Sequence, residues 1–165
     1  RSAGLKPGTF FRGLSAPLLT SFTTCSSAAA LSTNLTSVQK LGASRSVSSF
    51  SIPLGNTINM DGTAIYQAVC AVFIACCYGV ELTLGDMAMI VLTATLASVG
   101  TAGVSGAGMI MLAMVLQAMN IPVDMIMIIY GVDRLFDMGR TCLNVTGDIA
   151  CSLCVTKWES KKAGK

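Results

Sequence analysis

The feature that most constrains this chain is a run of ionic and polar residues at positions 133–148 (DRLFDMGRTCLNVTGD), which lies between apolar segments. On a helix with 100° per residue, the polar side chains of this run fall within an arc of about 100°. They are Asp133, Asp137, Arg140, Thr141, Asn144 and Asp148, and the opposite side of the helix is apolar. Such a helix either covers the surface of a soluble protein or turns its polar side toward a protein interior within a membrane.

The composition favours the membrane. The chain is 53% hydrophobic and 12% charged, whereas an average soluble domain is about 25% charged. The uncharged stretch 87–123 is longer than the ~20 residues that cross a bilayer. We therefore expect a multi-pass integral protein of an inner or plasma membrane. Carboxylates and guanidinium groups at membrane depth cost a few kcal/mol each unless they are paired, so the polar run predicts a substrate or ion site.

The order of the charges predicts the orientation. Lysines and arginines occur up to Arg45 and, apart from Arg134 and Arg140 in the polar run, again only from Lys157, while the segments between apolar stretches carry Glu81, Asp86 and Asp124. By the positive-inside rule both ends of the chain are cytoplasmic, and the acidic segments face outward. The chain must therefore cross the membrane completely an even number of times between residues 45 and 157.

The pattern along the chain predicts an all-α membrane protein with an inverted repeat of two re-entrant helical hairpins and two broken transmembrane helices. A break is expected around Asn59, Met60 and Asp61, where poor helix formers interrupt an apolar segment. The small residues at 97–108 are clustered, which favours a hairpin tip over a continuous packing seam. The expected segments are a connector at 1–13, hairpins at 14–45 and 87–120, transmembrane helices at 50–80 and 122–155, and a cytoplasmic tail at 156–165.

An enzyme is the alternative of another class. The sequence Gly103–Gly106 matches the G-x-S-G of intramembrane serine proteases, and Asp133 with Asp137 suggests an aspartyl pair. A serine protease needs a histidine base, and this chain has none, although we expect residues before Arg1 that could supply one. Aspartyl proteases place their two acids on different helices. We therefore predict a protein that is not an enzyme and has no nucleic-acid partner.

Three long runs carry a resemblance to a known family. They are PLGNTINMDGTAIYQ, TATLASVGTAGVSGAGMIMLAMVL and DMGRTCLNVTGD. In order and spacing they closely resemble the sodium-coupled glutamate/aspartate transporters, the dicarboxylate/amino acid:cation symporters, over residues 14–155. The resemblance implies the C-terminal half of a transport core, an acidic amino acid as substrate, Na+ without an organic cofactor, and a homotrimer when full length. No transport is expected from residues 1–165 alone.

The resemblance also assigns residues. Arg140 is expected to hold the side-chain carboxylate of the substrate, Asp137 its amino group and Asn144 its α-carboxylate. The implied substrate-binding set is Ser26, Ser27, Thr63, Val104, Gly108, Asp137, Arg140, Thr141 and Asn144. The implied sodium-binding set is Gly55, Thr57, Asn59, Asp61, Ser98, Val99, Thr101, Asn144 and Asp148.

Arg140 and Asp137 together predict aspartate or glutamate. Neutral-amino-acid relatives lack the arginine, and relatives that move C4-dicarboxylates lack the aspartate. Both of those substrate classes stay open as alternatives within the family.

Several residues depart from the family pattern. Ser105 stands where the second tip usually has proline, and Cys25 stands where archaeal members have arginine. The first tip has Ala28, Ala30 and Ser32 in place of serine, threonine and proline. Arg134 is an extra cation, and the sequence leaves its partner open between Asp133, Asp137 and the exterior.

Overall fold

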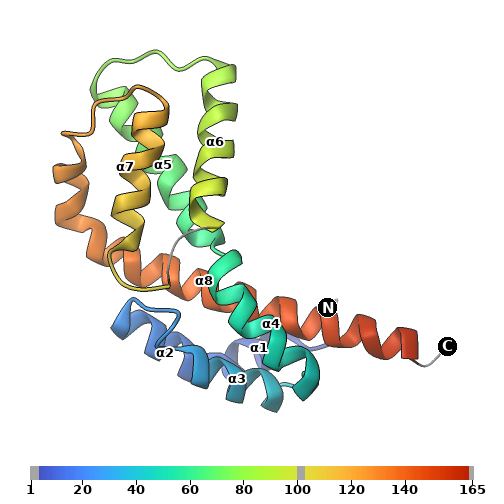
Figure 1. Cartoon of the computed structure of the whole chain (residues 1–165). Helices are drawn as coiled ribbons and strands as arrows, with labels where there is room; N and C mark the ends of the chain where they lie inside the picture. The colour runs from blue at the N-terminus through green and yellow to red at the C-terminus, as the bar shows by residue number, and fades with distance from the viewer. Residues whose placement is uncertain (1–3, 100–102, 164–165) are drawn as a thin grey trace.

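The computed structural model describes residues 4–99 and 103–163, and every regular element in them is an α-helix. Figure 1 shows α5, α6 and α7 standing side by side, with α2, α3 and α4 grouped at the other end of the molecule and α8 running between the two groups. The helices are α1 (Pro7–Gly13), α2 (Ser15–Thr24), α3 (Leu31–Lys40), α4 (Arg45–Ile58), α5 (Asp61–Cys77), α6 (Leu84–Val99), α7 (Ala107–Ala118) and α8 (Ile126–Ala163).

The first long apolar segment is interrupted where its sequence predicted a break. Asn59 (φ −88°, ψ 71°) and Met60 (φ −106°, ψ 45°) leave the helical conformation, and α5 starts at Asp61. The Asn59 N–H still donates to the carbonyl of Gly55 at 2.8 Å, while the Met60 carbonyl accepts from Ala64 at 2.9 Å. The break therefore creates a helix C-terminus and a helix N-terminus that face each other across two residues.

The second predicted break is wrong, because α8 is one uninterrupted helix from Ile126 to Ala163, although its first turns bend away from the rest in Figure 1. This helix contains no proline, and some of its polar side chains form hydrogen bonds with its own backbone. The hydroxyls of Thr141 and Thr146 donate to carbonyls four residues earlier, at 2.7 and 2.8 Å. The helix also extends through most of the expected tail.

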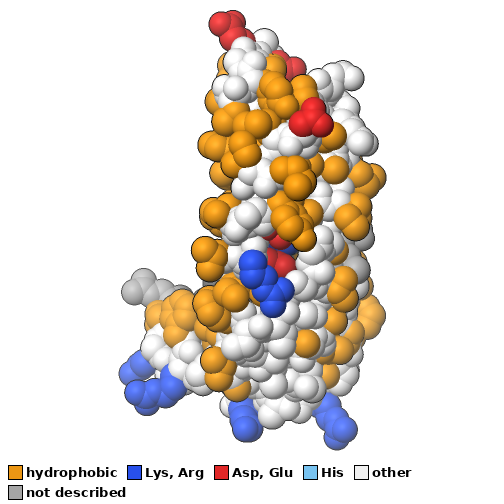
Figure 2. Space-filling view, turned by 90° about the vertical axis from the view of Figure 1, so that its left-hand side faces the viewer, with side chains coloured by type: hydrophobic (Ala, Val, Ile, Leu, Met, Phe, Trp, Pro, Cys, Tyr) orange, Lys and Arg blue, Asp and Glu red, His pale blue; other side chains and the backbone are white. Residues whose placement is uncertain are grey.

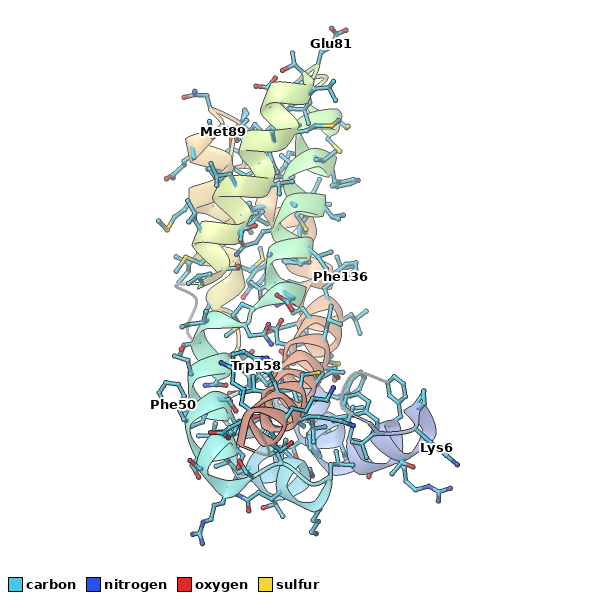
Figure 3. All side chains as sticks on the ribbon, turned by 90° about the vertical axis from the view of Figure 1, so that its right-hand side faces the viewer. Lys6, Phe50, Glu81, Met89, Phe136 and Trp158 are labelled. Atoms are coloured by element: carbon cyan, nitrogen blue, oxygen red, sulfur yellow. The ribbon has the colours of Figure 1, made fainter. Side chains whose placement is uncertain are left out.

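The surface of α8 reverses the pattern of a soluble protein. Asp137 and Asp148 are only 4% and 2% exposed, whereas Leu135 and Phe136 are 70% and 53% exposed. Figure 3 shows Phe136, Phe50 and Met89 pointing away from the helices. This arrangement excludes the solvated amphipathic helix, since the ionic side chains face inward and the apolar ones face the surroundings.

The buried polar residues lie between two apolar clusters. One cluster joins α5, α6 and α7 around Ile74, Ile90 and Leu112. The other joins α2, α3 and α4 to the second half of α8 around Val38, Ile52 and Ile149. The polar run of α8 spans the distance between them, so each cluster positions one end of the site.

The segment Arg45–Cys77, taken across its break, is the one part of residues 4–99 and 103–163 that is long and apolar enough to cross a membrane on length and composition. The helices α6 and α7 are apolar but shorter. Figure 2 shows hydrophobic side chains along the molecule, acidic ones at one end and basic ones at the other, with one further group of basic and acidic side chains halfway along. The charges are therefore separated in space as the order of the sequence predicted.

Candidate functional site

A small cavity lies where the α2–α3 turn, the α6–α7 connection, α5 and α8 meet. Its volume is about 20 Å³, which is room for roughly one water molecule. The lining consists of Cys25, Ser27, Met60, Thr63, Gly103, Val104, Gly108, Asp137, Arg140, Thr141 and Asn144. The predicted substrate-binding residues thus gather around one point, except Ser26, which does not line the cavity and donates its hydroxyl to the Gly103 carbonyl at the edge of it.

Arg140 is the cation of this cavity and is 7% exposed. Its Nε donates to Asp137 Oδ1 at 2.9 Å, and its Nη1 lies 3.4 Å from Asp133 Oδ1. Nη1 is buried without a hydrogen bond. The carboxylates of Asp133 and Asp137 offset the cost of burying the guanidinium. The Nη1 of Arg140 nevertheless remains available to donate a hydrogen bond to another acceptor.

Tyr66 completes the surroundings of Arg140, although sequence reasoning gave it no role. Its hydroxyl donates to Asp133 Oδ1 at 2.7 Å, and the guanidinium carbon of Arg140 lies 4.6 Å from its ring centroid. Tyr66 is three residues after Thr63, so both face the cavity side of α5. That spacing was the signal that could have identified it.

Asn144 joins α8 to the start of α5. Its Oδ1 accepts from the Gly62 N–H at 2.7 Å, and its Nδ2 donates to Thr63 Oγ1 and Met60 Sδ, both at 3.2 Å. A Cβ on Gly62 would lie 2.6 Å from the backbone oxygen of Arg140. Glycine is therefore required at position 62 for this close approach of the two helices.

The two helix connections touch each other at the cavity. Ser26 Oγ donates to the Gly103 carbonyl at 2.7 Å, and the Ala28 N–H donates to the same carbonyl at 3.2 Å. A Cβ on Gly103 would lie 2.5 Å from Ser27 Oγ, and one on Gly108 would lie 2.4 Å from Arg140 Nη1. Glycines at both positions allow the connection to lie directly on the polar side chains.

Asp148 lies at the break between α4 and α5. Its Oδ1 accepts from Asn59 Nδ2 at 2.9 Å, and its Oδ2 is buried without a hydrogen bond. A Cβ on Gly55 would lie 2.4 Å from Asp148 Oδ1. A buried carboxylate oxygen without a partner, beside an amide side chain and the carbonyls at a helix end, fits a hard cation.

The remaining residues of the predicted sodium set are less closely grouped. Asp61 and Thr57 are exposed, and Val99 is 43% exposed. Ser98 is buried and donates to the carbonyl of Thr95 at 2.8 Å. Thr101 lies outside the described residues. Within residues 4–99 and 103–163, no three acidic, histidine or cysteine side chains converge on one point, so a cation beside a single carboxylate would also need backbone or amide oxygens.

Comparison with known proteins places these residues in a family. Residues 1–158 match the model of the Sodium:dicarboxylate symporter family. The chain is 37% identical over 161 residues to the proton/glutamate-aspartate symporter of Escherichia coli, which covers 98% of the chain and 37% of that protein. It is 43% identical over 143 residues to a putative sodium-dependent excitatory amino acid transporter of Caenorhabditis elegans, covering 86% of the chain and 29% of that protein.

A human protein, neutral amino acid transporter A, is also 43% identical over 143 residues, which are 86% of the chain and 27% of that protein. The chain thus spans between about a quarter and two fifths of the length of these relatives. The chain belongs to the Sodium:dicarboxylate symporter family, whose members are membrane transporters and not enzymes.

Proposed function

We propose that this chain forms the substrate- and ion-binding part of a secondary active transporter that moves aspartate or glutamate together with sodium ions. The observation that carries the proposal is Arg140. It is a guanidinium 7% exposed, and its Nη1 has no hydrogen bond. A planar donor of this kind is suited to a carboxylate, and its position in an apolar molecule would be costly without a function.

The pair of Arg140 and Asp137 supports a substrate that carries both an amino group and an acidic side chain. Asp137 Oδ1 already accepts from Arg140, while Oδ2 accepts only long bonds, at 3.3 Å, from Ser105 Oγ and the Gly106 N–H. An ammonium group would be a stronger partner for Oδ2. A C4-dicarboxylate would not use this oxygen, and a neutral amino acid would leave Arg140 Nη1 with no hydrogen bond and only its ion pair with Asp133.

Sodium would be held by Asp148 Oδ2, with the carbonyls of Gly55, Asn59 and Asn144. We propose a second sodium site formed by Thr57, Ser98, Val99 and Thr101, and a third that contains Asn59 and Asp61. Bound sodium supplies positive charge, which would let an anionic substrate occupy a site that already contains Asp133 and Asp137. Asp148 would otherwise hold a buried charge whose Oδ2 has no partner.

For the arrangement in the membrane, we propose two re-entrant hairpins, α2–α3 and α6–α7, entering from opposite sides of an inner or plasma membrane. Both end at the cavity, where Ser26 and Gly103 touch. The family's transporters imply a multi-pass protein, and we propose a homotrimer for the full-length protein. A cavity of about 20 Å³ does not admit an amino acid, so the described state is closed and a hairpin must move for the substrate to enter.

The test is uptake by the full-length gene product in liposomes. Labelled aspartate is supplied outside, with an inward gradient of sodium, of protons or of neither, because the similar Escherichia coli protein is a proton symporter. Unlabelled glutamate, succinate, alanine and serine serve as competitors. We expect uptake that requires the sodium gradient and is inhibited by glutamate but weakly by the other three. Uptake driven by protons alone would contradict sodium coupling, and stronger inhibition by serine or succinate would contradict the substrate class.

A further inference from the structure

We propose that Arg134 is a latch that holds the α6–α7 connection closed over the cavity, by donating to the hydroxyl of Ser105. The inference rests on the proposed transport function, because it concerns how the same site opens. It assigns a role to the one cation that the sequence analysis left without a partner.

The latch is a short chain of polar contacts that leads from α8 to the connection and back. Arg134 Nη1 donates to Ser105 Oγ at 2.7 Å, and Ser105 Oγ donates to Asp137 Oδ2 at 3.3 Å. The Gly106 N–H donates to the same carboxylate oxygen at 3.3 Å. A hydroxyl that accepts from a guanidinium becomes a better donor, so the Arg134 contact strengthens the one between Ser105 and Asp137.

Of these three hydrogen bonds, the surroundings of Arg134 make the one between Arg134 and Ser105 the strongest. Arg134 is exposed, and its neighbours Val132, Leu135 and Phe136 are 44%, 70% and 53% exposed. Among such apolar side chains a guanidinium has few acceptors, and at membrane depth an unused donor is costly. The Ser105 hydroxyl offers that acceptor only while the connection lies against α8, which favours the closed state.

Cys25 provides a native reporter of opening. Its thiol is free, it is 2% exposed, and it lines the cavity together with Gly103 and Val104. A membrane-impermeant thiol reagent added from outside reaches Cys25 when the α6–α7 connection opens. Mass spectrometry of the peptide that contains Cys25 gives its labelling rate without replacement of the other cysteines. The measurement needs no substrate, so it stays informative even if the proposed substrate class is wrong.

The experiment compares variants of the full-length gene product in liposomes. We expect Arg134→Gln and Ser105→Ala each to raise the labelling rate of Cys25 about tenfold, the order expected for a lost hydrogen bond to a charged group. The double variant should label no faster than Ser105→Ala, because that variant already removes the bond from Arg134 together with the one to Asp137. Ser105→Thr keeps a hydroxyl and should label as the unchanged protein does. Arg45→Gln, which alters an exposed arginine at the start of α4, is the matched control and should also be unchanged.

Three results would contradict the proposed role of the bond between Arg134 and Ser105. Unchanged labelling in Arg134→Gln and Ser105→Ala would show that the bond does not hold the connection closed. Effects that multiply in the double variant would show that the two residues act separately. If Arg134→Gln does not fold, the contrast between Ser105→Ala and Ser105→Thr decides, and equal rates for those two would reject the proposal.

Discussion

The hydroxyl of Ser26 donates a 2.7 Å hydrogen bond to the carbonyl of Gly103, a residue 77 positions later in the chain. The N–H of Ala28 donates to the same oxygen at 3.2 Å. The two connections between helix pairs therefore meet at one backbone carbonyl, directly beside the cavity that contains Arg140. Both connections contribute residues to the lining of this cavity, so a movement of either one away from the other would break these bonds.

The close contact of α5 and α8 predicts the effect of a single methyl group. In Gly62→Ala the new Cβ would meet the backbone of Arg140, at 2.6 Å from its oxygen and 3.0 Å from its Cα. Backbone atoms cannot turn aside, so we expect a loss of about 1–3 kcal/mol of stability, measured as a lower Tm of the purified full-length protein in detergent.

The matched control is Gly131→Ala, where a Cβ on α8 meets nothing within 4 Å. It should leave the Tm unchanged or raise it slightly, since alanine favours a helix over glycine by about 0.5–1 kcal/mol. Equal Tm values for the two variants would contradict the proposed packing of Gly62.

Asp148 predicts a sodium-dependent stability. The unchanged protein should gain stability as sodium is added, by about 2.7 kcal/mol at 100 times the Kd of one site. Asp148→Asn keeps the shape of the side chain but removes the charge of the partnerless oxygen, so most of the sodium-dependent rise in Tm should disappear. Choline chloride at equal ionic strength separates specific binding from screening.

The control for Asp148 is Glu81→Gln, at an exposed acidic residue far from the break. It should retain the full response to sodium. A normal response in Asp148→Asn would place the cation elsewhere.

Asp137 predicts how the amino group is recognised. In Asp137→Asn the substrate ammonium loses its carboxylate, and Arg140 loses the partner of its Nε. Removing one partner of a buried charge pair costs about 3–5 kcal/mol, so aspartate should bind at least about 100-fold more weakly. Succinate has no amino group, and its affinity should fall less, which shifts the ratio of the two affinities toward succinate.

Asp124→Asn, at an exposed residue before α8, controls for a general loss of negative charge and should bind aspartate normally. An Asp137→Asn protein with an unchanged ratio of aspartate to succinate affinity would show that Asp137 does not contact the amino group.

The sequence was most informative where a pattern had one physical explanation. An ionic arc on an apolar helix has to face inward in a membrane protein, and Asp137 and Asp148 are buried accordingly. Poor helix formers in an apolar segment predicted the break that occurs at Asn59 and Met60. Small residues predicted close backbone approach, which Gly103 and Gly108 show.

The sequence was less informative where a contact depends on packing between distant elements. A break in the last helix was expected and does not occur, because α8 is continuous from Ile126 to Ala163. The role of Tyr66 depends on the rotation of α5 against α8, which brings its hydroxyl to Asp133. The partner of Arg134 could not be predicted either, because Ser105 comes from a connection whose distance from α8 only the fold decides.

The most direct test of the central claim is the affinity of the purified full-length protein for aspartate in sodium, measured by titration calorimetry with and without Arg140→Ala. The account predicts that the variant loses at least about 100-fold in aspartate affinity, because the side-chain carboxylate of the substrate would lose the guanidinium that holds it, while the variant still binds alanine or serine in a sodium-dependent way. Aspartate affinity within twofold of the unchanged protein would contradict the account, since another group would then hold the side-chain carboxylate.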